Sequence, residues 1–119
     1  MRPLQKIPLE EYLADENIQA IVERRLQLAI QVCLDIANYL IAHLRLTAPE
    51  ELPNVFDILG REGILPADLA RRMVGMVRFR NILVHDYLEM DARRVYRHLR
   101  EDLDDLDRFA RVIVERYLS

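Results

Sequence analysis

One stretch of the chain places polar residues in a segment that is otherwise apolar: Arg80-Asn81-Ile82-Leu83-Val84-His85-Asp86-Tyr87, called the motif octet below. The residues 73–79 that lead into it are mostly apolar, and a helix that is apolar nearly all round is usually buried. Placing an Arg, an Asn, a His and a Tyr in such a helix costs solvation free energy unless each finds a partner. Polar residues that interrupt an apolar helix in this way are typical of functional sites, so we expect the octet to carry the function.

Helical periodicity extends outward from the octet, and no alternating strand pattern of useful length occurs. Pro66 suits the first turn of a helix that runs from about Ala67 to the octet. Gly75 lies inside this helix, where it costs ~1 kcal/mol relative to Ala, and we expect close approach of a neighbouring helix to explain it. Further helices are predicted over residues 9–14, from 15–17 to about 44, over 54–61 with Gly63 closing it, and over 92–118. The pattern predicts one domain, residues 1–119, folded as an all-α, up-and-down bundle of about five helices.

The long helix that starts near residue 16 carries apolar residues on more than one side. One apolar face recurs at three- and four-residue steps from Ile18 to Leu44. A second set widens the apolar sector beyond what one neighbouring helix needs: Ile21, Leu28, Val32 and Tyr39. We expect another helix or a second subunit to cover this set.

The bulk composition excludes several classes of protein. Half of the residues are apolar, which argues against disorder, and no apolar run approaches the ~20 residues of a membrane span. The first residues lack the apolar core of a secretion signal, so we expect a soluble, cytoplasmic protein. Cys33 is the only cysteine, which excludes an internal disulfide, and its place on an apolar helix face predicts a buried small side chain.

Charge is distributed unevenly along the chain. The net charge of −3 argues against broad, non-specific binding of nucleic acid, but residues 71–100 hold eight Arg against three acids. These Arg residues bind phosphate or form a solvated face paired with acids across the bundle, and charge alone leaves both readings open. The last helix has an acidic band, which we expect to be solvated: Asp102, Asp104, Asp105 and Asp107.

The octet holds groups suited to phosphate chemistry. Asn81 and His85 are four residues apart and share a helix face, whereas Arg80 lies about 140° round from His85. These groups converge only if the helix ends or loosens near His85, or if two copies pool their side chains across a two-fold axis. Two His for proton transfer and two Arg for negative charge would suffice to cleave RNA without metal. From the residues alone, a structural His and an Arg80 paired with a nearby acid remain equally open.

Three segments together resemble a known family. The octet fits the form Arg-x4-His-x-Tyr, residues 23–30 read Glu-Arg-Arg-Leu-Gln-Leu-Ala-Ile, and residues 54–59 are followed by Gly63-Ile64-Leu65. In this order, over roughly residues 15–117, they are similar to the HepT branch of the HEPN domains. The resemblance implies a five-helix HEPN bundle that forms a homodimer, with motifs from both protomers lining one cleft.

The resemblance also implies an activity and a partner. It implies a metal-independent ribonuclease, with RNA as substrate and no cofactor, that is the toxin of a toxin–antitoxin pair. The usual antitoxin is a small MntA-type nucleotidyltransferase. Carried over by position, Arg80 and His85 form the catalytic pair, Asn81 and Asp86 support them, and Tyr87 is modified with AMP, which blocks cleavage.

Two alternatives to an enzyme remain open at this point. One is a non-catalytic interaction module that binds a nucleotidyltransferase and uses Arg80 and His85 to hold a nucleotide or phosphate. The other is a dimeric structural protein with a buried polar motif. No spacing of His, Cys, Asp or Glu predicts a metal site, and no Gly-rich phosphate loop occurs.

Overall fold

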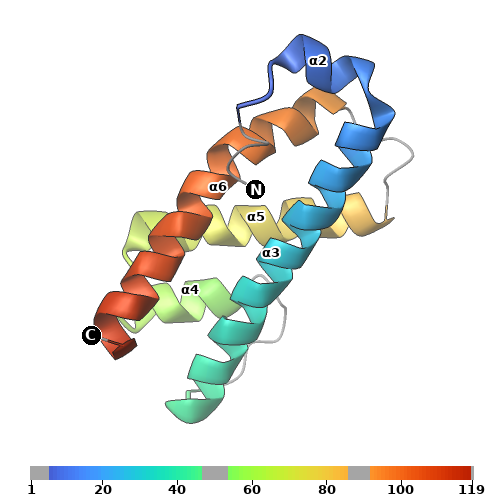
Figure 1. Cartoon of the computed structure of the whole chain (residues 1–119). Helices are drawn as coiled ribbons and strands as arrows, with labels where there is room; N and C mark the ends of the chain where they lie inside the picture. The colour runs from blue at the N-terminus through green and yellow to red at the C-terminus, as the bar shows by residue number, and fades with distance from the viewer. Residues whose placement is uncertain (1–5, 47–53, 86–91, 119) are drawn as a thin grey trace.

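The computed structural model describes residues 6–46, 54–85 and 92–118, and within them every regular element is a helix. The elements in chain order are α2 (Leu9–Ala14), α3 (Glu16–His43), α4 (Asn54–Arg61), α5 (Ala67–His85), α6 (Ala92–Ile113) and a π-helical turn η2 (Val114–Leu118). Long α3 and α6 form one layer, and α4 and α5 cross behind them (Figure 1). The predicted all-α bundle of five helices is confirmed.

Helix α3 begins and packs as its sequence predicts. The side chain of Asp15 caps it by accepting hydrogen bonds from the backbone N–H groups of Asn17 at 2.9 Å and Ile18 at 3.2 Å. Eight of its residues are buried in the core, Cys33 among them. Burial raises the pKa of the Cys33 thiol to about 12, which keeps it a neutral, small apolar group.

The expectation that no segment could span a membrane needs a correction for α3. Among the described helices, α3 is long and apolar enough to cross a membrane by length and composition. This is weak evidence for a membrane helix, because the core helix of a globular domain passes the same test. The apolar composition of α3 arises because it carries apolar residues on two sides, and one of these sides is buried against the bundle.

The predicted role of Gly75 is wrong, and another glycine fills it. A Cβ added at Gly75 would meet no atom within 4 Å, so no helix approaches there. A Cβ at Gly60 of α4 would lie 2.7 Å from the Cβ of Ala70 in α5, which is closer than real Cβ atoms come. Gly63 ends α4 with φ of +73°, as the sequence predicts. Gly60 therefore permits the close packing of α4 on α5.

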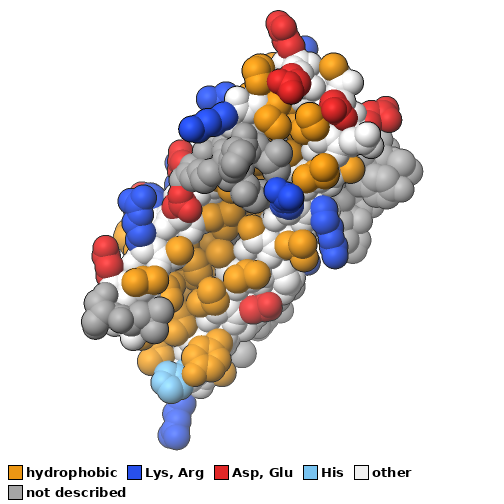
Figure 2. Space-filling model, in the orientation of Figure 1, with side chains coloured by type: hydrophobic (Ala, Val, Ile, Leu, Met, Phe, Trp, Pro, Cys, Tyr) orange, Lys and Arg blue, Asp and Glu red, His pale blue; other side chains and the backbone are white. Residues whose placement is uncertain are grey.

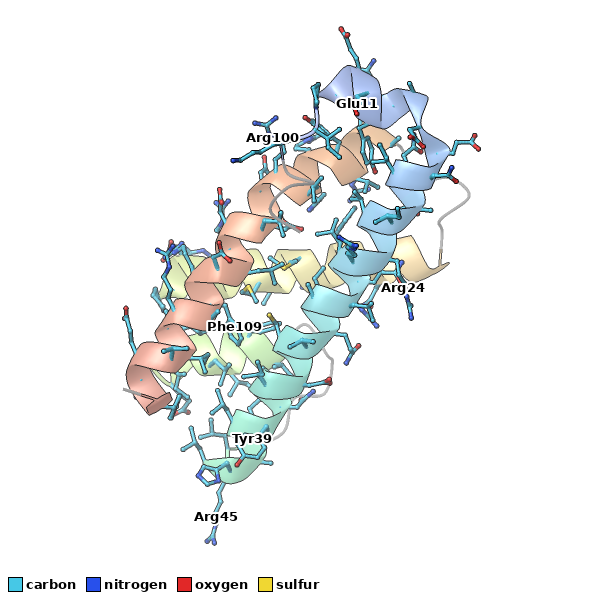
Figure 3. All side chains as sticks on the ribbon, viewed as in Figure 1. Glu11, Arg24, Tyr39, Arg45, Arg100 and Phe109 are labelled. Atoms are coloured by element: carbon cyan, nitrogen blue, oxygen red, sulfur yellow. The ribbon has the colours of Figure 1, made fainter. Side chains whose placement is uncertain are left out.

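Two groups of buried side chains form the core. The larger lies between α3, α4, α5 and the end of α6, where the rings of Phe56 and Phe109 meet edge to face at 5.7 Å (Figure 3). The smaller lies under α2, where Tyr12 and Tyr96 pack with centroids 5.3 Å apart, and it includes Phe79 of α5. Phe79 precedes Arg80, so the second core group anchors the start of the motif octet.

The acidic band of α6 is only partly solvated. Asp104 is exposed, but Asp102 and Asp105 are each only 5% exposed, against our expectation. The reason is helical geometry, because Asp102 stands seven positions from both Val95 and Phe109 and so shares their buried side. Both carboxylates have partners, which burial of a charge requires.

Candidate functional site

Helix α5 carries the first part of the motif octet. It is regular from Ala67 to His85, which is the last described residue before residue 92. Arg80 and Asn81 are both half-buried. For His85 the structure describes the backbone, while Asp86 and Tyr87 lie outside the described residues. The sequence prediction for these last three side chains therefore stays a prediction.

Arg80 is held by an amide of the neighbouring helix α3. Its Nη2 donates a hydrogen bond of 2.8 Å to Oε1 of Gln31. The Nε of Arg80 is buried and has no hydrogen-bond partner among the residues that the structure describes. Gln31 in turn donates from Nε2 to Oδ1 of Asp35, one turn further along α3, at 2.9 Å. Sequence periodicity places Gln31 away from the apolar face of α3, but it gives no sign that this amide meets Arg80.

Arg72, on the same helix, has a different environment. Its Nε lies 2.9 Å from both carboxylate oxygens of the buried Asp105, and this carboxylate raises the pKa of the guanidinium. Arg108 of α6 likewise donates to Asp68 at 3.0 Å, and that hydrogen bond lowers the pKa of the carboxyl. The reading of the Arg-rich segment as paired with acids across the bundle holds for Arg72, whereas Arg80 is held by a neutral group, and phosphate binding stays a prediction.

A regular helix keeps positions 80 and 85 apart. The backbone places residue 85 about 140° round the axis from residue 80, as it does for any two helical residues five apart. Asn81 shares the side of position 85. Because α5 is helical through position 85, α5 alone does not bring Arg80 and His85 to one side of the helix, and their pooling between two copies stays a prediction.

A stacked His supports α5 behind the octet. The ring of His98 in α6 lies parallel to that of Phe79 with centroids 3.6 Å apart, and its Nδ1 is 3.0 Å from Oδ2 of Asp102. Burial raises the pKa of the Asp102 carboxyl, and the hydrogen bond from His98 opposes that rise. These contacts give His98 a structural role between α5 and α6.

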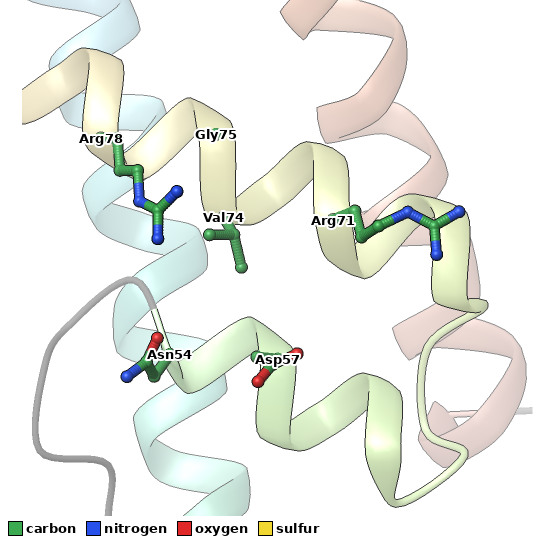
Figure 4. A pocket seen from close by; sticks show the side chains of 6 residues that line it. All are labelled: Asn54, Asp57, Arg71, Val74, Gly75 and Arg78. Atoms are coloured by element: carbon green, nitrogen blue, oxygen red, sulfur yellow. The ribbon is translucent and has the colours of Figure 1, made fainter.

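A polar hollow of about 400 Å³ opens between α4 and α5, lined by Asn54, Asp57, Arg71, Val74, Gly75 and Arg78 (Figure 4). Figure 4 shows Arg78 reaching from α5 toward α4. Arg78 stands seven positions before His85 and thus on the same side of α5. Among the residues that the structure describes, no three His, Cys, Asp or Glu side chains lie close enough to hold a metal ion.

The fold is that of HEPN toxins of toxin–antitoxin pairs. A crystal structure of a toxin–antitoxin with AMP-PNP matches with a TM-score of 0.79 and 30% identity, over 83% of this chain and 75% of that one. A structure of a tri-AMPylated Shewanella oneidensis HEPN toxin in complex with MNT antitoxin matches with a TM-score of 0.78 and 31% identity, over 83% and 74% of the two chains.

The chain itself belongs to the Ribonuclease HepT-like family, whose model matches residues 2–113. It is 30% identical over 103 residues to the mRNA nuclease HepT of Shewanella oneidensis, covering 87% of this chain and 77% of that protein. It is 31% identical over 96 residues to the tRNA nuclease HepT of Aphanizomenon flos-aquae, covering 81% of this chain and 65% of that protein. The resemblance found in the sequence is confirmed.

Proposed function

We propose that this protein is a metal-independent endoribonuclease, the toxin of a toxin–antitoxin pair, with Arg80 and His85 as its catalytic residues. The family and the nuclease names of two relatives support the class of reaction. One observation carries the assignment to this site. Arg80 is half-buried beside the motif and hydrogen-bonded to the neutral Gln31, so its charge is not offset by an acid among the described residues. An Arg in this state is suited to a phosphate.

The chemistry follows from two residue types. An imidazole takes the proton of a ribose 2′-OH, the 2′-oxygen attacks the adjacent phosphorus, and the bond to the 5′-oxygen breaks as that oxygen receives a proton from a second imidazole or from water. Arg80 stabilises the negative charge that builds on the phosphate oxygens. The products are a 2′,3′-cyclic phosphate and a free 5′-hydroxyl, and the reaction written in this way uses no metal ion.

We propose that a second copy completes the site. The residues Ile21, Leu28, Val32 and Tyr39 form an exposed apolar stripe on α3, with exposed fractions of 45–66%. Hydrophobic side chains gather over α3 and between α3 and α6 (Figure 2), and Tyr39 projects from the far end of α3 (Figure 3). Leu28 and Val32 flank Gln31, which holds Arg80. A copy of the chain seated on this stripe would bring its own motif octet toward the first.

The antitoxin is proposed to be a nucleotidyltransferase of the MNT type that transfers AMP to Tyr87. The similar Shewanella oneidensis toxin is described as tri-AMPylated and in complex with an MNT antitoxin. Adenylate on Tyr87, two residues after His85, would add negative charge and bulk beside the motif and repel RNA. We propose a cytoplasmic location, where RNA and this partner are both present.

The proposal is tested by RNA cleavage in excess EDTA. Purified protein is incubated with total bacterial RNA, and the 3′ ends of the products are analysed for cyclic phosphate. We expect cleavage by the parent and at least a 100-fold lower rate for His85→Ala. Arg61→Ala, which removes an exposed guanidinium at the end of α4, away from the stripe on α3, is the control and should cleave like the parent. Equal cleavage by His85→Ala and the parent would overturn the assignment.

A further inference from the structure

We infer that Gln31, oriented by Asp35, is a positioning residue that holds the Arg80 guanidinium for the scissile phosphate. This inference rests on the proposed ribonuclease function and adds a part of the machinery from α3, outside the motif octet. It comes from three side chains in a row, with Asp35 accepting from Gln31 and Gln31 accepting from Arg80.

The row gives the Gln31 amide one useful orientation. An amide has a donor end and an acceptor end, and only the acceptor end can receive a hydrogen bond from a guanidinium. The Nε2 of Gln31 donates to Asp35 at 2.9 Å, which turns Oε1 toward Arg80, where Nη2 lies 2.8 Å away. Gln31 and Asp35 are four residues apart on α3, so the helix itself sets their spacing.

A neutral holder leaves the charge of Arg80 available. Arg72 shows the contrast on the same helix, since Asp105 accepts both of its short contacts and compensates its charge. Gln31 is neutral, so it fixes the direction of the Arg80 guanidinium without offsetting its positive charge, and the attraction for an anion is kept. The negative charge of Asp35 stands one side chain further away, on the far side of the amide.

The buried Nε of Arg80 supports the same reading. No described residue forms a hydrogen bond with it, and an unsatisfied buried donor costs on the order of 1–3 kcal/mol. A purely structural Arg would be placed to satisfy this group, as Arg72 is. Burial of the inner end and the Gln31 bond at Nη2 together set the direction of the remaining Nη1. We assign that group to the phosphate.

The first test is kinetic, with a mixed-sequence RNA oligonucleotide that carries a fluorophore and a quencher. Gln31→Ala is expected to lower kcat about 10- to 100-fold with KM changed less than about 3-fold, because a misplaced Arg80 loses contact mainly in the transition state. Gln31→Glu keeps an acceptor at the same place but offsets the charge of Arg80, as Asp105 does for Arg72, and loses the hydrogen bond to Asp35, so its kcat should also fall well below that of the parent. Asn38→Ala removes an exposed amide from the same side of α3, seven positions on, and should leave both constants unchanged.

A second readout separates this inference from the proposed function. The Nε–H of Arg80 is buried, so its NMR signal should persist at pH 8 in the parent and be lost to exchange in Gln31→Ala, with Arg80→Lys identifying the signal. An active parent whose Gln31→Ala variant keeps its kcat, or whose Gln31→Glu variant is as active as the parent, overturns the inference alone. An unchanged Arg80 signal in Gln31→Ala overturns it as well. A parent that cleaves no RNA while Gln31→Ala loses the signal overturns the proposed function and leaves the contact intact.

Discussion

The same substitution at two glycines is predicted to change stability in opposite directions. Gly75→Ala adds a methyl group where nothing lies within 4 Å, inside α5. The helix then gains about 0.5–1 kcal/mol from the better propensity of Ala, with no packing cost. Gly60→Ala gains a similar amount in α4, but its Cβ would lie 2.7 Å from the Cβ of Ala70. Overpacking of this kind costs about 1–3 kcal/mol, because α4 and α5 must separate or shift.

The net expectation for Gly60→Ala is therefore a loss of about 0.5–2 kcal/mol, against a gain of about 0.5–1 kcal/mol for Gly75→Ala. Thermal unfolding followed by circular dichroism at 222 nm resolves the two, since 1 kcal/mol corresponds to roughly 4 °C or more in Tm at this chain length. The two variants differ from the parent by the same single methyl group, so each is the control for the other. A Gly60→Ala protein as stable as the parent would refute the packing argument for α4 on α5, and a destabilised Gly75→Ala would show that this face of α5 is covered.

Three further predictions concern buried polar groups. Arg72→Ala should lower the free energy of unfolding in urea by about 1–3 kcal/mol, because Asp105 stays buried without its partner, whereas Arg61→Ala, which breaks an exposed pair with Asp57, should change it by less than about 0.5 kcal/mol. Burial raises the folded-state pKa of Asp102, with Asp105 and Glu101 adding to the rise and the His98 hydrogen bond opposing it. Ionisation of Asp102 therefore lowers the free energy of unfolding as the pH rises above ~4, the ordinary pKa of an Asp side chain. The stability of Asp102→Asn relative to the parent should therefore increase between pH 4 and pH 7.5 in urea titrations, and a constant difference would contradict this. Cys33, with its pKa raised to about 12 by burial, should resist iodoacetamide at pH 8 in the folded protein and react on unfolding, as mass spectrometry would show.

Helix periodicity predicted most of the fold because local signals decide it. The bounds of α2 and α4 follow from apolar spacing and from flanking Pro and Gly residues, and Asp15 caps α3 as predicted. The second apolar set on α3 was also identified from the sequence, from four residues at helical spacing. In the single chain these residues are exposed, so no described helix covers them, and their cover by a second subunit stays a prediction. These features depend on residues within two or three turns of one another.

Features that depend on contacts between helices were not predictable in the same way. Gln31 and Arg80 are 49 residues apart, and only the crossing of α3 and α5 brings them together. The same holds for the glycines, because the crossing of α4 and α5 selects Gly60 as the close approach. The burial of Asp102 was within reach of the sequence, since its spacing from Val95 and Phe109 already put it on the core side of α6.

The candidate site was predicted as a set of residues rather than as a geometry. The octet identified Arg80, Asn81 and His85 as candidate residues, and their catalytic and supporting roles stay a prediction. What a helical wheel could not decide was whether Arg80 pairs with an acid or stays available, and the Gln31 contact answers that question for the described part of the chain. The meeting of Arg80 with His85 remains a prediction, and we propose that it requires a second copy of the chain.

That requirement is tested most directly with a heterodimer of two inactive variants. Arg80→Ala and His85→Ala chains with different tags are co-expressed, and the mixed dimer is isolated by two successive affinity steps. If each site draws Arg80 from one subunit and His85 from the other, the mixed dimer keeps one intact combination and should cleave RNA at about half the parent rate. Each variant alone should be nearly inactive. A mixed dimer as inactive as either variant would contradict the account of a site shared between two subunits.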